Sequence, residues 1–182
     1  MDIDTTAASS GQLPCDLVSA IRHAYQAAGI TVTSAARREA ESAEYGACRL
    51  GLNGVVVVFR AARTTPTKIG QFVTLWKRPE PGAEIAPLDS GDGVDFVVVS
   101  VSDARQRGQF VYSREALIKH GVMSHGGKGG KRAIRVYPPW SKPVAAAAIK
   151  TQQWQLRYFL ALTTDFGADP AQVRKLFKAR EL

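Results

Sequence analysis

The chain has 182 residues, of which 45% are hydrophobic and 22% charged, a composition typical of one soluble globular domain. Apolar runs such as residues 55–59 are far too short to cross a bilayer, and residues 1–12 show no basic-then-apolar signal pattern, so we expect neither membrane insertion nor secretion. The two cysteines, Cys15 and Cys48, form no CxxC pair, which favours a reduced, cytoplasmic protein without a metal site.

The net charge of +8 is concentrated in the second half of the chain. Residues 1–103 hold 9 Lys and Arg against 12 Asp and Glu, a net charge of −3, whereas residues 104–182 hold 15 against 4, a net charge of +11. A positive surplus confined to one region is expected of a protein that binds a polyanion such as nucleic acid. The alternative is that the charge serves solubility alone.

The first half of the chain predicts one helix followed by strands. Apolar residues at helical spacing, ended by Gly29, predict a helix over residues 14–28. Residues 37–45 are charged and predict a short helix or an ordered loop. An Asn53-Gly54 dipeptide indicates a hairpin turn. The predicted strands, recognised by alternating or β-branched residues, are 48–53, 55–63 and, after a turn between Pro66 and Gly70, 72–77.

A loop rich in proline and glycine, residues 79–93, leads into the second half of the chain. Residues 95–101 are nearly all apolar and predict a strand that is buried on both faces. Short strands are expected at 110–112 and 133–137. The expected helices are 114–120, which Gly121 ends, 143–163, capped by Ser141, and 170–180, opened by Asp169.

Together these elements predict one α+β domain over residues 13–182. A mixed central sheet of about five to six strands should be flanked by N- and C-terminal helices. Residues 1–12 are polar and acidic, and we expect them to form a disordered tail.

The stretch HGGKGGKRAIRVYPPW, residues 125–140, combines glycines, cations and aromatic residues. A glycine-rich loop can direct backbone N–H groups at a phosphate, with Lys128, Lys131 and Arg132 supplying charge. The spacing does not fit a Walker A loop, which argues against ATP binding. The alternative is a flexible glycine loop before an edge strand.

The strand within this stretch has two chemically different sides. Alternation directs Ile134 and Val136 toward the core, which leaves Arg135 and Tyr137 on the other side to meet a ligand.

Two further clusters place cations on either side of a tryptophan. One has helical spacing, so its members share a face on which a base could stack on the indole between two phosphate-binding cations. The other lies along a predicted strand, whose charged ends could line a groove. The alternative for both is that the tryptophan packs in the core and the cations are solvated. The clusters are Lys150, Trp154 and Arg157 on the helix, and Lys68, Trp76, Lys77 and Arg78 on the strand.

Five sequence blocks, in order and almost end to end, resemble the MepB-like protein family. The blocks are EYGACRLGLNG, PTKIGQFVTLWKR, GVDFVVVSV, KGGKRAIRVYPPW and KTQQWQLRYF. The family takes its name from a bacterial operon that also carries a multidrug efflux pump. The resemblance implies a compact α/β protein, similar to restriction-endonuclease-type folds and suspected of binding DNA. The preference for DNA over RNA rests on this resemblance alone.

A restriction-type nuclease needs a carboxylate on one strand and a Glu/Asp-x-Lys motif on the next, often with a glutamate from the preceding helix. Strand 55–63 has no acid, and residues 75–77, LWK, keep the lysine of the motif without its acid. Glu44 and Asp95 remain as candidate carboxylates beside Lys77, with Mg²⁺ as the cofactor. The alternatives are a helix-end charge for Glu44 and a turn residue for Asp95.

The sequence therefore predicts a non-catalytic nucleic-acid-binding protein with a basic groove and no cofactor. One alternative is a divalent-metal nuclease with a degenerate site. Another is a protein-partner module of a regulatory or efflux system, for which an exposed apolar patch would be the distinguishing feature. The predicted nucleic-acid-binding residues are Lys68, Lys77, Arg78, Lys128, Lys131, Arg132, Arg135, Tyr137, Lys150, Trp154 and Arg157.

Overall fold

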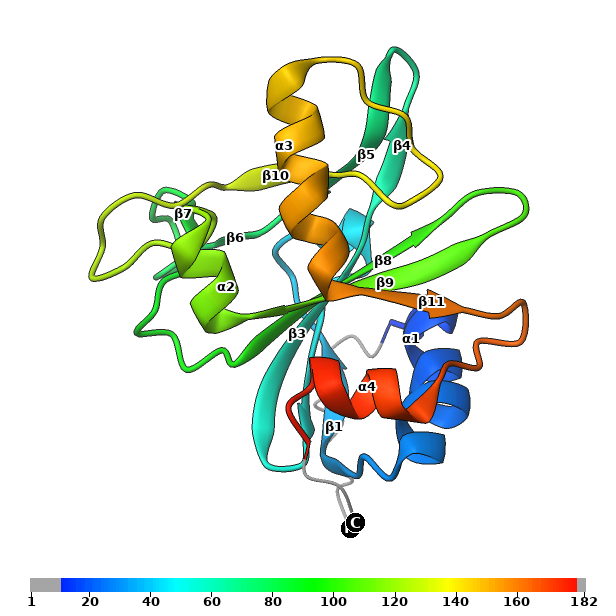
Figure 1. Cartoon of the computed structure of the whole chain (residues 1–182). Coiled ribbons are helices and arrows are strands. Elements are labelled where there is room, and N and C mark those ends of the chain that lie inside the picture. Colours follow the sequence, from blue (N-terminus) through cyan, green and yellow to red (C-terminus); the bar gives the residue numbers. More distant parts are fainter. Residues whose placement is uncertain (1–10, 180–182) are drawn as a thin grey trace, which may run out of the picture.

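A six-stranded mixed sheet forms the centre of the molecule (Figure 1). The computed structural model describes residues 11–179. The strands of this main sheet are β1 (Val32–Arg38), β2 (Cys48–Leu52), β3 (Val55–Ala61), β8 (Phe96–Ser102), β9 (Arg107–Ser113) and β11 (Phe159–Leu162). Their order is β1-β2-β3-β8-β9-β11, and all neighbours are antiparallel except β3 and β8, which run parallel.

Two sequence signals account for the centre of this sheet. Asn53 and Gly54 both have positive φ, 48° and 80°, which is the conformation that a two-residue hairpin turn requires, and they join β2 to β3. Six of the seven residues of β8 are buried, as expected of a strand that is covered on both faces.

A smaller second layer is inserted in the crossover between the parallel strands β3 and β8. It contains β4 (Arg63–Thr65), β5 (Lys68–Thr74), β6 (Trp76–Lys77) and β7 (Ala86–Pro87), joined by β10 (Ala133–Val136) from later in the chain. The order is β10-β5-β4 in one sheet and β6-β7 in a short ribbon. The pairing of β10 with β5, in which Val136 lies opposite Gln71, connects the second layer to the C-terminal half of the chain.

The helices cover both faces of the main sheet: α1 and α4 pack on one face, and α2 and α3 pack on the other. Figure 1 shows α3 on one side of strands β8, β9 and β11 and α4 on the other. The helical segments are α1 (Cys15–Ala20), continued by η1 (Ile21–Tyr25) and η2 (Gln26–Ala28); η3 (Ala43–Tyr45); α2 (Arg114–Lys119); α3 (Ala146–Gln155), continued by η4 (Leu156–Tyr158); and α4 (Pro170–Leu176).

The main sheet separates two clusters of buried side chains. In the first cluster, the ring of Phe177, just after α4, contacts Tyr25 and Phe96 with centroid separations of 5.0 and 5.5 Å. The second cluster lies toward β5, β10 and α2 and includes Val97 and Leu117. Both faces of the sheet are therefore buried, which explains the continuous apolar sequence of β8.

The predicted class, a single α+β domain on a mixed sheet, is confirmed by this topology. The predicted tail, residues 1–12, falls outside the described residues except for its last two positions. Among residues 11–179, none of the helices has the length and apolar character needed to span a bilayer.

Two element predictions were wrong. Residues 32–38 form strand β1, so Arg37 and Arg38 belong to a sheet edge, and only residues 43–45 of the segment 37–45 are helical. The helix predicted over 143–163 ends at Tyr158, its N-cap is Ala145 instead of Ser141, and residues 159–162 form β11. Burial of Leu160 and Leu162 against the main sheet outweighs the helical propensity of the segment.

Candidate nucleic-acid interface

A polar groove of about 280 Å³ lies where α2, β10 and α3 meet. We call it the α2–β10–α3 groove. Cations and aromatic rings line it, and none of its lining residues within the described part of the chain is acidic. The polar and aromatic lining residues are His120, Lys131, Arg135, Tyr137, Thr151, Trp154 and Gln155.

Strand β10 supplies one wall of the groove through its alternating side chains. Ile134 and Val136 are buried in the second cluster, so Arg135 and Tyr137 lie on the other side of the strand and line the groove. This is the division of sides that alternation predicts.

Gln155 fixes α3 against β10. Its side chain is fully buried; Oε1 accepts a hydrogen bond from the backbone N–H of Tyr137 (2.9 Å), and Nε2 donates one to the carbonyl of Arg135 (2.9 Å). Gln152 donates to the carbonyls of Tyr137, Pro138 and Ser141. The segment TQQWQ therefore fixes the backbone of the segment RVYPPW through these two glutamines.

Trp154 lies between the core and the groove. Its indole is only partly buried, stacks on the imidazole of His120 and packs against Tyr112, with a centroid separation of 5.5 Å in the second contact. Burial lowers the pKa of His120, and the nearby charges of Lys119 and Arg157 lower it further. The environment of this histidine is therefore positive.

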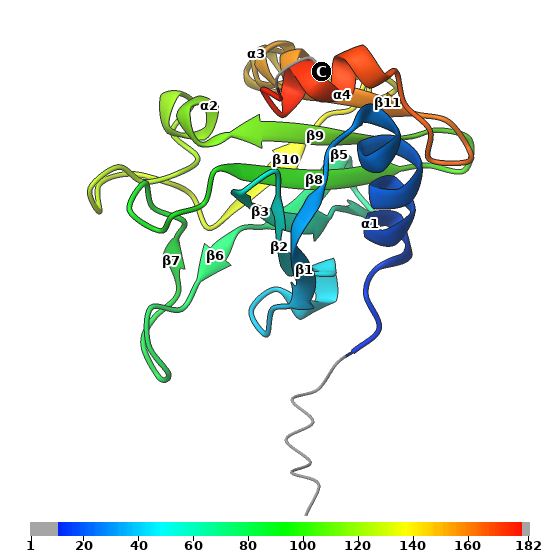
Figure 2. The ribbon, with the colours of Figure 1, turned by 90° about the horizontal axis from the view of Figure 1, so that it is seen from below.

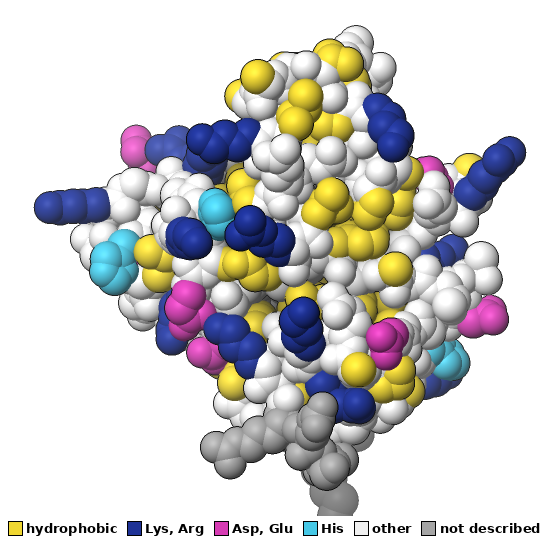
Figure 3. Space-filling view, viewed as in Figure 1, with side chains coloured by type: hydrophobic (Ala, Val, Ile, Leu, Met, Phe, Trp, Pro, Cys, Tyr) yellow, Lys and Arg dark blue, Asp and Glu magenta, His cyan; other side chains and the backbone are white. Residues whose placement is uncertain are grey.

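Exposed cations surround the groove. Figure 3 shows Lys and Arg side chains gathered beside α3 on the side of α2, around a histidine. None of these cations forms an ion pair with another residue of the described segment 11–179. These exposed cations are Lys119 on α2, Lys131 and Arg132 just before β10, Lys150 on α3 and Arg157 on η4.

The glycine-rich loop is held by Asp89 and Ser90. Asp89 Oδ1 accepts hydrogen bonds from the Gly127 N–H (2.9 Å) and the Ser124 hydroxyl (2.7 Å), and Ser90 Oγ accepts one from Gly126. These bonds hold the pKa of Asp89 well below its usual range. The N–H groups of Gly126 and Gly127 are thus bonded within the protein, and the cation that the loop presents is the exposed Lys128.

Arg135 lines the groove but is already bonded to the second layer. Its Nη1 donates to the carbonyls of Ile69 (3.2 Å) and Gly70 (3.4 Å), and its Nη2 donates to Thr65 Oγ1 (2.7 Å). The guanidinium therefore holds β10 to the β4-β5 hairpin. It has fewer free N–H donors for a phosphate than a cation without hydrogen bonds inside the protein would have.

The strand cluster lies apart from the groove. Lys77 forms an ion pair with Asp92, and Arg78 forms one with Glu41 at 2.9 Å. Lys68 is exposed on β5, beside a shallow apolar surface that includes Tyr137 and Val144. None of the strand-cluster residues lines the α2–β10–α3 groove: Trp76, Lys77 and Arg78 line a different cavity, and Lys68 lies apart from them.

The two candidate nuclease carboxylates lie near opposite ends of β3. Asp95 accepts a hydrogen bond from the N–H of Val56 (2.8 Å) at the start of the strand. Glu44 belongs to η3. Its neighbour in η3, Tyr45, lies under the guanidinium of Arg63, which follows the end of β3. A seven-residue strand spans roughly 20 Å, so these carboxylates cannot share one ion. Within residues 11–179, no group of three or more His, Cys, Asp or Glu side chains could hold a metal.

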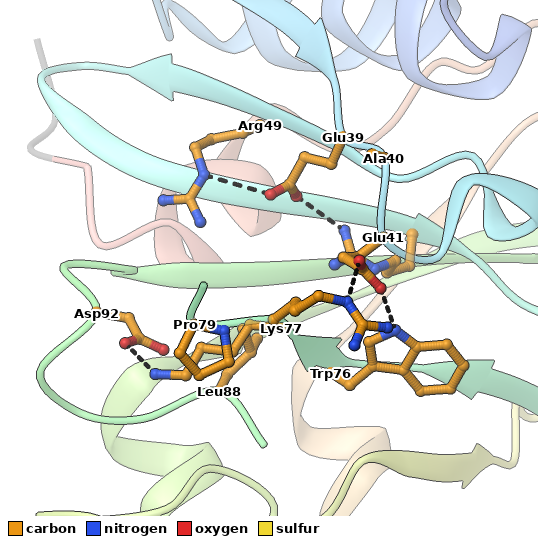
Figure 4. Close-up of a pocket in the computed structure, with 11 residues that line it drawn as sticks. Glu39, Ala40, Glu41, Arg49, Trp76, Lys77, Pro79, Leu88 and Asp92 are labelled. Carbon is orange, nitrogen blue, oxygen red and sulfur yellow. Dashed lines mark hydrogen bonds and ion pairs between the residues drawn. The ribbon is translucent and has the colours of Figure 1, made fainter. Parts of the chain in front are cut away.

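A second, charged cavity of about 580 Å³, which we call the Arg60 cavity, is lined by Trp76, Lys77 and Arg78 of the strand cluster together with residues that sequence reasoning missed (Figure 4). Glu39 forms ion pairs there with Arg60 (3.1 Å) and Arg49 (3.6 Å). Glu41 accepts hydrogen bonds from Trp76 Nε1 (3.1 Å) and Arg78 Nε (2.9 Å). Its sequence signal is Arg60 itself, a cation that interrupts the apolar run of β3.

The fold and the groove define a class: an α+β protein with a mixed sheet and a cation-lined groove beside its longest helix. The MepB-like family model matches residues 39–161, and the chain belongs to this family. It is similar to a solved chain described as the crystal structure of MepB, with 32% sequence identity and a TM-score of 0.67. That match covers 70% of this chain and 85% of the MepB chain. No curated protein matches.

Proposed function

We propose that this MepB-like protein binds duplex DNA non-catalytically through the α2–β10–α3 groove and the cations around it. The observation that carries the proposal is a groove lined by Lys131 and His120, with no acidic lining residue in the described chain, beside cations that form no ion pair there. Such a surface attracts phosphates and is costly to leave unscreened. Trp154, at the groove wall, is stacked on His120, so its contribution is to hold that side chain in the groove.

The test is binding of labelled duplexes of unrelated sequence across a salt series of about 50 to 200 mM. Affinity should fall steeply with salt, because each neutralised phosphate releases condensed counterions. Replacing Lys131 and Arg132 together by Gln should reduce the log-affinity versus log-salt slope by about 1.8, at roughly 0.9 per phosphate. The loss should be equal for all sequences, since phosphate contacts carry no base information.

The matched control removes the same charge elsewhere. Arg22 lies on η1 and Arg105 in the turn between β8 and β9; both are exposed, and Figure 1 shows α1 and this turn away from α2. Their double Gln variant should keep the wild-type slope. A salt-independent affinity in the wild type, or equal slopes in all three proteins, contradicts the proposal. Duplex RNA in the same assay tests the preference for DNA.

The nuclease alternative gains no support from the geometry, because Glu44 and Asp95 lie near opposite ends of β3. Lys77, the third candidate, is paired with Asp92. We therefore expect duplexes to be recovered intact after incubation with Mg²⁺. Cleavage that disappears in Asp95→Asn would restore the nuclease assignment.

A protein-partner role is the second candidate function, favoured by one apolar surface. Val144 is 83% exposed and Ile69 45% exposed, on a shallow hollow of about 290 Å³ between α3 and β5. A Val144→Asp variant that loses a cellular partner but keeps DNA binding would support it.

For location we propose the cytoplasm. Cys15 and Cys48 are both unpaired, which suits a reducing compartment.

A further inference from the structure

The Arg60 cavity is separate from the α2–β10–α3 groove, and no residue lines both. It is formed where the end of β1, the strand β3 and the β6-β7 ribbon meet, and Figure 2 shows that ribbon displaced from α3 toward the β1 edge of the main sheet. Its volume of about 580 Å³ falls within the range of roughly 300 to 1,000 Å³ typical of small-ligand sites.

A buried guanidinium with unused donors lies in the wall of this cavity. Arg60 is only 2% exposed, and its Nη1 donates to Glu39 Oε1 (3.1 Å) and to the carbonyl of Phe59 (2.9 Å). Its Nε is buried without a hydrogen-bond partner, and no bond from Nη2 to any residue in 11–179 is formed. The Nε–Nη2 edge of an arginine can bind a carboxylate or phosphate group in a bidentate manner, through two parallel N–H···O hydrogen bonds.

The charges around the cavity favour an anion over a metal ion. Four cations and three carboxylates line it, and every one of the carboxylates is already paired with a cation. A divalent cation would therefore meet net repulsion, whereas an anionic group would meet guanidinium donors. The cations are Arg49, Arg60, Lys77 and Arg78, and the carboxylates are Glu39, Glu41 and Asp92.

The remaining lining is apolar and includes a ring. Trp76, Pro79 and Leu88 contribute to the same cavity, and the indole is fixed by the hydrogen bond from its Nε1 to Glu41 (3.1 Å). A rigid indole beside a proline offers a flat contact for a planar ligand group at little cost in side-chain entropy.

We propose that the Arg60 cavity binds a small organic anion, with its carboxylate or phosphate group on Arg60 and Arg49 and its planar part against Trp76. This binding goes beyond the proposed nucleic-acid function and does not depend on it.

The test is calorimetric titration of the full chain with adenosine monophosphate, benzoate and inorganic phosphate. Adenosine monophosphate or benzoate should bind saturably and more tightly than inorganic phosphate, because a ring adds contact with Trp76. The stronger of the two identifies the head group as phosphate or carboxylate. Arg49 is 43% exposed, so Arg49→Gln should fold normally and weaken binding at least about tenfold.

The control is Arg132→Gln, which removes the same charge from the DNA-binding surface and should leave the affinity for the probe unchanged. The indole N–H resonance of Trp76, assigned with Trp76→Phe, should move on titration while those of Trp140 and Trp154 do not. Binding of both ring probes weaker than about 10 mM, or equal loss in Arg49→Gln and Arg132→Gln, overturns the proposal. Neither result changes the salt slope for DNA, so the two proposals fail separately.

Discussion

The imidazole of His120 lies flat against the indole of Trp154, with ring centroids 4.1 Å apart and planes 5° from parallel. The histidine closes α2 and the tryptophan belongs to α3, so this stack joins the two helices across the head of the groove. The charge state of one side chain therefore affects both the stability of this junction and the potential of the groove.

The first prediction concerns stability and pH. Burial, Lys119 and Arg157 lower the pKa of His120 below its ordinary value of 6.5, so the unfolded chain binds this proton more readily than the folded one. The stabilisation is complete above that ordinary value and is lost as the pH falls through the lowered pKa. Urea unfolding of the wild type and of His120→Gln should show a smaller loss below about pH 6 in the variant. Parallel pH profiles would argue against it.

The second prediction couples His120 to DNA. Phosphates bound in the groove would offset the positive field of Lys119 and Arg157, so the pKa of His120 should rise on binding. Affinity should then increase as the pH is lowered from about 8 to about 6. An NMR titration of His120 with and without duplex measures the shift directly. A pKa that does not change on saturation with DNA would place the phosphates elsewhere.

The third prediction separates Arg135 from its neighbour Arg132. Arg135→Gln removes three hydrogen bonds to the β4-β5 hairpin and should lower the free energy of unfolding by about 1–3 kcal/mol. Arg132 is exposed, and Arg132→Gln should change it by no more than about 0.5 kcal/mol. Denaturant unfolding of both variants gives the comparison. Equal stabilities would mean that Arg135 is available to a ligand.

The fourth prediction compares two adjacent glycines in the loop. Gly129 and Gly130 have φ of 75° and 84°, so alanine at either position should cost about 1–2 kcal/mol. A Cβ at Gly129 would meet open space, but at Gly130 it would lie 2.7 Å from Pro87 Cβ and 2.8 Å from Ser124 N. Gly130→Ala should therefore be less stable than Gly129→Ala by about a further 1–3 kcal/mol in thermal or urea unfolding. Indistinguishable variants would show that the loop repacks freely.

The fifth prediction compares two glutamines of α3. Gln155→Leu leaves the N–H of Tyr137 and the carbonyl of Arg135 without their partners, which should cost about 2–4 kcal/mol. Gln153 is exposed, and Gln153→Leu should stay within about 0.5 kcal/mol of the wild type. The difference in urea midpoint measures it. A Gln155→Leu variant as stable as Gln153→Leu would mean that water replaces both bonds.

Local signals were sufficient for the parts of the fold that depend on neighbouring residues. Asn53-Gly54 indicates its hairpin because both residues tolerate positive φ, and the apolar run 95–101 indicates a strand that needs cover on two faces. The orientation of Ile134 and Val136 followed from alternation alone.

Long-range packing decided what the sequence could not show. Residues 159–162 have the composition of a helix end, yet they pair with β9, where Gly108 leaves room for the ring of Phe159. Strand β1 was missed in the same way. Its last residues, Arg37 and Arg38, are charged and look like the start of a helix or loop, but they belong to a strand at the edge of the sheet.

The other residues of the Arg60 cavity were missed for a related reason. Glu39, Arg60 and Asp92 are far apart in the sequence and meet only in the folded chain. The likeness to restriction endonucleases stays a prediction.

The contact of Phe177 with Tyr25 has a consequence for the time course of synthesis. These residues are separated by 152 positions, and their rings lie in the first core beside Phe96. A growing chain can form the β2-β3 hairpin early, but the first cluster of buried side chains stays incomplete until residue 177 has left the ribosome. Contacts of this sequence separation slow folding and prolong the exposure of apolar strands such as β8. We therefore expect chains of this protein to depend on chaperones until residue 177 has emerged from the ribosome.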